Sequence, residues 1–380
     1  MDKFKKLETP FYYYDIELLR QTLETIRHEA EKRNFLVHYA IKANANTRIL
    51  CEIASYGFGA DCVSGNEIIR ALECGFDASK ITFAGVGKTY QEILLALEND
   101  IFCFNVESLQ EIEAIEKAGK EKKKKAHVAL RINPNINADT HQYITTGLSE
   151  NKFGLNKKDI SKAIDIISKC THIELIGIHF HIGSQITHFN IFEDLCRKAE
   201  FWEQQMKEKG IELKHINMGG GLGINYEDPN SYPIADFKNY FHLFEKGIKS
   251  SKATIHFELG RAIVGQCGSL ITRVIYIKDG ESKTFVIVDA GMNDLIRPAL
   301  YQAEHRIENI SSAKAVKPYD VVGPICESSD LFGKNTQINE PQQDDILAIR
   351  SAGAYGESMA SQYNCRKLVT SFFSDSLKNR

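Results

Sequence analysis

The sequence predicts an α/β protein with a (β/α)8 TIM-type barrel and a C-terminal all-β domain. Between residues 36 and 260, eight short apolar runs alternate with stretches whose apolar residues recur at helical spacing. Eight such repeats over about 225 residues fit a barrel, whose usual length is about 250 residues. After residue 262, strand-like runs follow one another without helical stretches, which indicates a β-rich domain. An open doubly wound sheet is the alternative for the first part.

The order of the elements supports this reading. The expected barrel strands are Leu36–Lys42, Gly59–Val63, Ile81–Ala84, Ile101–Val106, His127–Ile132, Leu175–His181, His215–Met218 and Ile255–Glu258. Helical patterns between them include Thr47–Tyr56, Glu67–Cys74, Tyr90–Glu98 and Leu109–Ala118. In the β-rich part we expect strands at Ser269–Lys278, Thr284–Asp289, Tyr319–Val322 and Asp344–Arg350. Asp279-Gly280 marks a hairpin turn after the first of these.

These elements divide the chain into two domains, as its length of 380 residues also suggests. We expect the barrel over residues 25–260 and the β-rich domain over residues 261–380. A strand over residues 9–15, which contains three consecutive tyrosines, is expected to join the β-rich domain.

Composition excludes several classes of function. With 47 basic and 50 acidic residues, the net charge is −3, so neither nucleic acid nor an anionic membrane surface is an expected partner. The basic run Lys120–Lys125 reads as a solvated helix end or loop. The nine cysteines are odd in number and form no C-x-x-C pair, which disfavours a zinc ribbon. With no secretory signal and no long apolar span, we expect a cytoplasmic protein with reduced thiols.

The candidate catalytic groups fall at the carboxyl ends of the expected strands, where barrel enzymes place their active sites. Lys42 closes the first strand in H-Y-A-I-K-A-N (38–44). It is either a surface lysine or an amine placed for chemistry. His179 and His181 end the sixth strand in H-F-H-I-G-S-Q (179–185) and, being two apart, point the same way. They are a metal pair, satisfied core histidines, or a ring that stacks on a flat ligand beside Ser184.

The last two barrel strands add an anion site and an acid. G-G-G-L-G (219–223) follows the seventh strand, and glycines let backbone N–H groups approach a phosphate closely. E-L-G-R (258–261) ends the eighth strand, where Glu258 can pair with a protonated ring nitrogen and Arg261 can hold an anion. A lysine that forms an imine, a phosphate loop and an acid for a pyridine nitrogen jointly predict pyridoxal 5'-phosphate as the cofactor.

Taken together, these motifs resemble those of the fold-type III pyridoxal-phosphate decarboxylases, and within them the diaminopimelate decarboxylase branch. The four barrel motifs match the whole group, whereas three C-terminal motifs match that branch. These are D-A-G-M-N-D-L-I-R-P-A-L-Y (289–301), G-P-I-C-E-S-S-D (323–330) and G-A-Y-G (353–356). The similarity extends from Thr9 to Arg366. One departure is Leu259, where the family usually has proline; it leaves Glu258 and Arg261 in register.

The resemblance implies a role for each matching position. Lys42 would hold the cofactor and Cys326 would donate the proton. The other cofactor contacts would come from His181, Ser184, Gly219, Gly220, Gly221, Glu258, Leu259, Gly260, Arg261 and Tyr355. The substrate would bind to Arg261, Arg297, Tyr301, Glu327 and Tyr355. No metal is implied.

The implied reaction is the decarboxylation of meso-2,6-diaminopimelate to L-lysine and CO2, the last step of lysine biosynthesis. The resemblance also implies a homodimer with shared active sites, in which Lys42 and Cys326 of one site come from different subunits. Three alternatives remain open: carboxynorspermidine decarboxylase, a noncatalytic pyridoxal-phosphate-binding relative, and a metal-dependent barrel hydrolase. The first is disfavoured by C-E-S-S-D and by the spacing of Arg297 and Tyr301.

Overall fold

The computed structural model describes residues 2–136 and 152–378. The chain forms two compact units, each assembled from separate segments. The barrel unit consists of Leu23–Gly223 and Asp236–Gly260. The sheet unit consists of Met1–Thr22, Ile224–Ala235 and Arg261–Arg380. Within the described residues, no helix combines the length and apolarity needed to cross a membrane.

The barrel unit is a closed barrel of eight parallel strands, so the TIM-type prediction is confirmed and the open sheet is excluded. Its strands are β2 (Leu36–Ala40), β3 (Gly59–Cys62), β4 (Ile81–Phe83), β5 (Cys103–Val106), β6 (Ala126–Arg131), β7 (Ile173–His179), β8 (His215–Asn217) and β9 (Thr254–Leu259). β9 closes the barrel against β2, with Glu258 beside His38.

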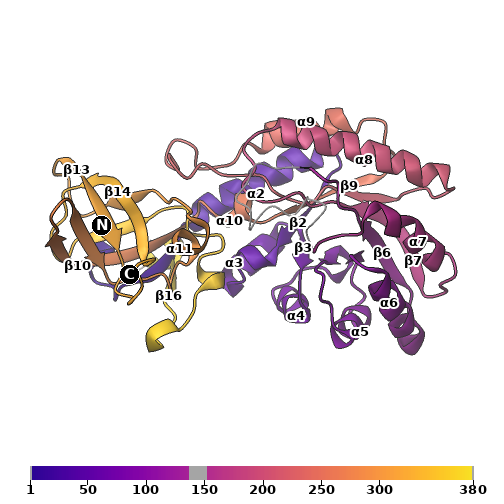
Figure 1. Ribbon diagram of the computed structural model, residues 1–380, viewed down its shortest axis with the longest axis horizontal. Coiled ribbons are helices and arrows are strands. Elements are labelled where there is room, and N and C mark those ends of the chain that lie inside the picture. Colours follow the sequence, from indigo (N-terminus) through magenta and orange to yellow (C-terminus); the bar gives the residue numbers. More distant parts are fainter. Residues whose placement is uncertain (1, 137–151, 379–380) are drawn as a thin grey trace. The chain divides into compact units, whose positions relative to one another are not determined.

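Helices connect the barrel strands, and in Figure 1 α4 to α9 lie around the outside of the strands. They are α3 (Thr47–Ser55), α4 (Gly65–Glu73), α5 (Tyr90–Glu98), α6 (Leu109–Lys122), α7 (Lys157–Ile167), α8 (Asn190–Glu208) and α9 (Phe237–Gly247). Most begin where a short polar side chain accepts a hydrogen bond from the first turn. At α5, Thr89 and Glu92 form a reciprocal capping box. Such caps fix where each helix starts, and thereby the length of the loop before it.

The interior of the barrel contains two layers of hydrogen-bonded polar side chains. Residues two apart on a strand point to the same side, so His256 and Glu258 of β9 share a face. Nearer the amino-terminal ends of the strands, His256 bonds to His38 at 2.8 Å and to His215 at 2.9 Å. Nearer the carboxyl ends, Glu258 and its partners form a second polar layer. The carboxyl-end layer is the one that faces the loops expected to carry function.

The sheet unit is built around an eight-stranded sheet. Six of its strands pair in the order β12-β15-β10-β11-β13-β14, and the other two are β1, which pairs with β10, and β16, which pairs with β1. Its strands are β1 (Phe11–Tyr14), β10 (Gly268–Asp279), β11 (Thr284–Val288), β12 (Ile307–Asn309), β13 (Val316–Val322), β14 (Leu331–Asn339), β15 (Ile346–Ile349) and β16 (Thr370–Phe373). β1 runs antiparallel to β10 and parallel to β16. The sheet unit also contains the helices α1 (Asp2–Lys5), α10 (Arg261–Val264), α11 (Arg297–Tyr301) and α12 (Ser374–Lys378). Helix α2 (Ile16–Glu31) begins in the sheet unit and ends in the barrel unit.

The largest departure from the sequence-based expectation concerns Ile224–Ala235. This segment falls inside the range predicted for the barrel, yet it belongs to the sheet unit. It is tied there by polar contacts: Gln266 donates to the carbonyl of Asn225, and the hydroxyl of Tyr226 accepts from Arg261 and Arg297. The hydrophobic pattern of the segment does not reveal these bonds.

Candidate active site

Lys42 lies just beyond β2, in a short 3-10 turn (Ile41–Ala43), and not within the strand as predicted. Its Nζ atom is 3.3 Å from Oδ2 of Asp61 on β3. The Lys42 side chain is 37% exposed, whereas the Asp61 side chain is fully buried and its Oδ1 has no partner among the described residues. Burial, and next the charge of Glu258, raise the pKa of Asp61 to about 7 although Lys42 opposes the shift. The amine is therefore accessible from the barrel mouth and has a proton acceptor beside it.

Glu258 lies at the carboxyl end of β9 and is fixed by three donors. Its Oε1 accepts from Asn105 at 2.9 Å and Asn217 at 2.7 Å, and its Oε2 accepts from Nε2 of His179 at 2.9 Å. Burial alone would raise the pKa of Glu258, but His179 and then Lys42 outweigh it, and the net shift is downward. Glu258 is thus kept as a carboxylate inside the barrel.

His181 and the glycine loop lie together. The N–H of Gly219 donates to Oδ1 of Asn217 at 2.9 Å, and that of Gly220 points to Nδ1 of His181 at 3.4 Å. No hydrogen bond involves the N–H of Gly221, within the described part of the chain. Gly221 has a φ of +112°, which glycine adopts readily, and an added Cβ would lie 2.9 Å from the carbonyl of Gly183. Of the three glycine N–H groups at 219–221, that of Gly221 alone lacks a hydrogen-bond partner among the described residues.

The protonation state of His181 follows from its surroundings. Burial, and then the charges of Lys42 and Arg131, hold the pKa of His181 well below its usual value. Its ring is therefore neutral near pH 7 and suited to stacking on a flat ligand. Ser184 lies three residues further on and is partly exposed.

The sheet unit brings together two buried arginines. Arg261 is 5% and Arg297 is 4% exposed, and both donate to the hydroxyl of Tyr226, at 2.6 and 2.9 Å. The guanidinium of Arg261 also lies 5.0 Å from the centre of the Tyr355 ring. Tyr355 has a φ of +57°, so its backbone is in the left-handed region. Tyr301 is the last residue of α11, the helix that Arg297 begins.

Cys326 and Glu327 lie on an exposed loop of the sheet unit. Asp330 secures the base of this loop, because its carboxylate accepts from the backbone N–H of Ile325 at 2.6 Å and of Met292 at 2.7 Å. Glu327 accepts from the hydroxyl of Tyr363 at 2.7 Å. The thiol is thus held at the tip of a well-anchored loop that reaches into solvent.

Leu259 and Gly260 follow Glu258, and Leu259 is the last residue of β9. The Leu259 side chain is 1% exposed and pairs in register with Tyr39 of β2. Leucine at this position is therefore accommodated by ordinary strand packing.

Five residues of these two clusters were not predicted from the sequence. Three come from the barrel interior and two from the sheet unit: Asp61, Asn105, Asn217, Tyr226 and His305. Asp61 could have been identified from the sequence, because burying a carboxylate within the apolar run Gly59–Val63 costs free energy and therefore indicates a functional role. The others acquire their roles only through long-range packing.

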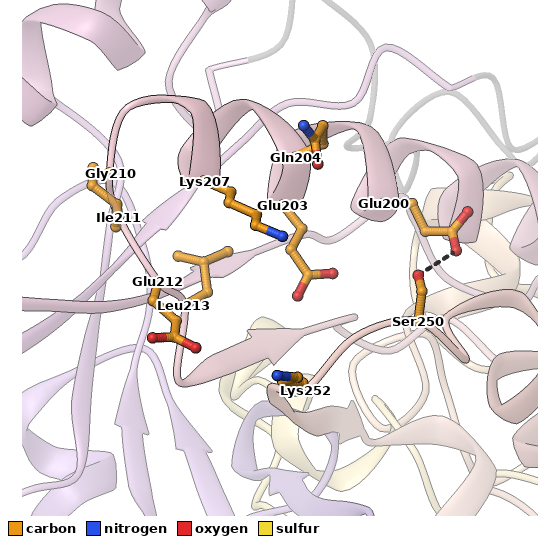
Figure 2. A pocket seen from close by; sticks show the side chains of 10 residues that line it. All are labelled: Glu200, Glu203, Gln204, Lys207, Gly210, Ile211, Glu212, Leu213, Ser250 and Lys252. Atoms are coloured by element: carbon orange, nitrogen blue, oxygen red, sulfur yellow. Dashed lines mark hydrogen bonds between the residues drawn. The ribbon is translucent and has the colours of Figure 1, made fainter.

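A surface cavity of about 510 Å³ lies outside the barrel, by the C-terminal half of α8. Figure 2 shows that Glu200, Glu203 and Lys207 reach toward it from α8, with Lys252 opposite. Its lining includes none of the residues predicted for catalysis or cofactor binding. Within residues 2–136 and 152–378, no cluster of three or more His, Cys, Asp or Glu side chains suits a metal ion.

The chain is similar to known proteins over nearly its whole length. Residues 17–265 match the family model described as "Pyridoxal-dependent decarboxylase, pyridoxal binding domain". A diaminopimelate decarboxylase of Bacteroides thetaiotaomicron is 54% identical over 379 residues, which cover 99% of this chain and 98% of the relative.

Solved structures agree with the sequence matches. Diaminopimelate decarboxylase from Helicobacter pylori complexed with L-lysine superposes with a TM-score of 0.93 at 41% identity, covering 98% of this chain and 93% of the other. The enzyme from M. jannaschii in co-complex with L-lysine gives a TM-score of 0.92 at 36% identity, covering 98% and 89%.

Proposed function

Because this chain belongs to the diaminopimelate decarboxylase family of pyridoxal-dependent decarboxylases, we propose that it converts meso-2,6-diaminopimelate to L-lysine and CO2. The cofactor of the family is pyridoxal 5'-phosphate. The observation that carries the choice of substrate is the pair of buried guanidinium groups, Arg261 and Arg297, in the sheet unit.

The residues of the barrel unit fit the cofactor. Lys42 offers a partly exposed primary amine beside a proton acceptor, and the N–H of Gly221 has no hydrogen-bond partner among the residues that the structure describes. Glu258 is a buried carboxylate, and the neutral ring of His181 is suited to stacking. Lys42 would hold the aldehyde carbon, Glu258 would face the ring nitrogen, and Gly221 with Ser184 would bind the phosphate. Gly219 and Gly220 would shape that loop, Leu259 and Gly260 would lead from Glu258 to Arg261, and Tyr355 would complete the contacts.

The chemistry divides between the cofactor and this chain. When bound, pyridoxal phosphate accepts the electron pair that remains at Cα as CO2 leaves. Glu258 sustains that capacity because its carboxylate favours a proton on the ring nitrogen. Asp61 can take a proton from Lys42 when the amine needs to be neutral. The thiol of Cys326 would supply the proton that replaces CO2 at Cα.

Recognition of the substrate favours diaminopimelate over carboxynorspermidine. Diaminopimelate keeps a second amino-acid end, whose carboxylate suits buried arginines, and Glu327 is available for its amino group. The end of carboxynorspermidine remote from its carboxylate is a polyamine, which buried guanidinium groups would repel. A substrate lacking the distal carboxylate would leave the charges of the two arginines unpaired. Such a loss commonly lowers kcat/KM by several orders of magnitude relative to the proper substrate.

The test is a comparison of specificity constants. We expect kcat/KM for meso-diaminopimelate to exceed those for carboxynorspermidine, ornithine and L-lysine by at least about a hundredfold. Comparable constants for diaminopimelate and carboxynorspermidine would contradict the substrate assignment and leave the cofactor assignment standing.

We further propose that the chain is a homodimer whose active sites are shared, with Cys326 reaching the Lys42 of the partner. The loop around Cys326 supports this, because its thiol is exposed while Asp330 fixes the base of the loop. A cytoplasmic location is supported by the nine cysteines, all of which are free thiols.

A further inference from the structure

We propose that Tyr226 and His305 are positioning residues that orient Arg297 and Arg261 toward the substrate's distal carboxylate. The inference rests on the proposed function and deepens it. Neither residue was predicted from the sequence, and both lie in the sheet unit with the arginines.

The hydroxyl oxygen of Tyr226 joins two like charges. It accepts from NH1 of Arg261 at 2.6 Å and from NH1 of Arg297 at 2.9 Å. The same ring lies 5.9 Å from the Arg261 guanidinium carbon and 5.1 Å from that of Arg297. A phenolic oxygen can accept two hydrogen bonds, so a single side chain sets the spacing of both cations.

His305 holds Arg297 from the other side. Nδ1 of His305 lies 2.8 Å from the carbonyl oxygen of Arg350, which can only accept, so Nδ1 carries the proton. Nε2 is therefore an acceptor, and NH1 of Arg297 donates to it at 2.9 Å. Burial, and next the charge of Arg297, lower the pKa of His305 to about 3, so the ring stays neutral. Its ring also packs edge-on against Tyr226, with 5.1 Å between centres.

These contacts determine which edge of Arg297 remains for a ligand. NH1 has two hydrogens, and Tyr226 and His305 accept one each. The Nε atom is buried and has no hydrogen-bond partner within the described residues. No carboxylate of the described residues forms an ion pair with Arg297. The Nε–NH2 edge is thus left for a bidentate interaction with a carboxylate.

The electrostatics of Tyr226 support the same role. Burial alone would raise the pKa of Tyr226, but the charges of Arg261 and Arg297 outweigh it and the net shift is downward. Electron density on the phenolic oxygen offsets the repulsion between the two guanidinium groups. Removing the hydroxyl would take away the acceptor that holds the two guanidinium groups at a fixed spacing.

The experiment compares two ligands that differ only by a carboxylate: L-lysine and 1,5-diaminopentane. Their dissociation constants are measured by calorimetry on the holoenzyme, which requires no turnover. Wild type should prefer L-lysine by at least about tenfold, or about 1.4 kcal/mol. Tyr226→Phe, with normal cofactor content, should bind L-lysine about tenfold more weakly and 1,5-diaminopentane within about twofold of wild type.

Matched variants distinguish a loss of arginine orientation from a general loss of structure in the sheet unit. Tyr232→Phe removes an exposed hydroxyl in the same segment and should keep the wild-type preference. His305→Leu removes the acceptor and should lower the preference, whereas His305→Gln, whose side-chain oxygen can replace Nε2, should restore most of it.

Each outcome has a separate meaning. A Tyr226→Phe protein that keeps the preference for L-lysine, or that loses affinity equally for both ligands, would overturn the positioning role. A wild-type protein without any preference for L-lysine would overturn the arginine clamp itself, and the proposed substrate with it. The wild-type measurement alone therefore distinguishes failure of the proposed function from failure of this inference.

Discussion

Nε2 of His179 lies 2.9 Å from Oε2 of Glu258, and both side chains are almost completely buried in the barrel. His179 is thereby a donor to the carboxylate, and its other ring nitrogen, Nδ1, has no partner among the described residues. The other oxygen of Glu258 accepts from two asparagines. Three donors around one buried carboxylate favour its charged form, which is the form that a protonated ring nitrogen needs.

Replacing Glu258 with Gln should therefore reduce turnover far more than cofactor affinity. The amide keeps one oxygen for the asparagines, and His179 can rearrange its proton to suit the new NH2 group. We expect kcat to fall at least about a hundredfold, equivalent to about 2.7 kcal/mol of transition-state stabilisation. The dissociation constant of pyridoxal phosphate should change much less. Glu113→Gln, on the exposed side of α6, is the control, and near-normal turnover of Glu258→Gln would refute the role.

Lys42→Ala protein should lack the visible absorbance of lysine-bound pyridoxal phosphate. An imine requires a primary amine, and Lys42 supplies one at the barrel mouth. Lys80→Ala removes an exposed lysine whose Nζ donates to the carbonyl of Gly57, and it should keep the wild-type spectrum. An unchanged spectrum in Lys42→Ala would place the imine on another lysine.

The histidine chain inside the barrel predicts loss of stability in acid. His38 donates through Nδ1 to the carbonyl of Lys80, so its Nε2 must accept from His256, which in turn accepts from His215. Burial is the main reason that the pKa values of all three lie below 6.5. The folded state therefore binds fewer protons than the unfolded state below pH 6.5, and stability must fall as the pH drops from there toward the folded pKa values.

The corresponding measurement is the pH slope of the unfolding free energy of the purified enzyme. Each histidine that stays neutral contributes about 1.4 kcal/mol per pH unit below 6.5. His256→Gln, which can still donate and accept, should reduce the slope by about that amount between pH 6 and 5. Equal slopes for variant and wild type would show that His256 is protonated in the folded protein.

Mixing two inactive variants tests the shared active site. Lys42→Ala and Cys326→Ala subunits, combined in equal amounts and allowed to exchange, should form about half hybrid dimers by random pairing. Each hybrid would contain one site with both lesions and one with neither, so activity should recover toward a quarter of wild type. If exchange is demonstrated and no activity returns, both residues of a site come from one subunit.

The sequence predicted the architecture well because periodicity is a local property. The eight barrel strands were located to within a few residues, although Lys42 lies in a turn after β2 and not inside the strand. Three strands of the sheet unit, β12, β14 and β16, were not foreseen. β14 is partly exposed and polar, and the other two are short, so none has a strong apolar pattern.

The supporting residues of the site were less predictable. Asn105, Asn217 and His179 reach Glu258 only because the closed barrel directs side chains of β5, β8 and β7 into the interior that Glu258 of β9 also faces. Tyr226 lies three residues after the glycine loop, yet it belongs to the sheet unit and accepts from two arginines that lie 35 and 71 residues away in the sequence. Partners at such separations leave no periodic signal in a single sequence.

The most direct test of the proposed function is product analysis with the purified holoenzyme and meso-2,6-diaminopimelate. We predict that CO2 and L-lysine form in equal amounts, and that the Lys42→Ala protein forms neither. Absence of CO2 release from this substrate under conditions in which the holoenzyme retains its cofactor would contradict the account.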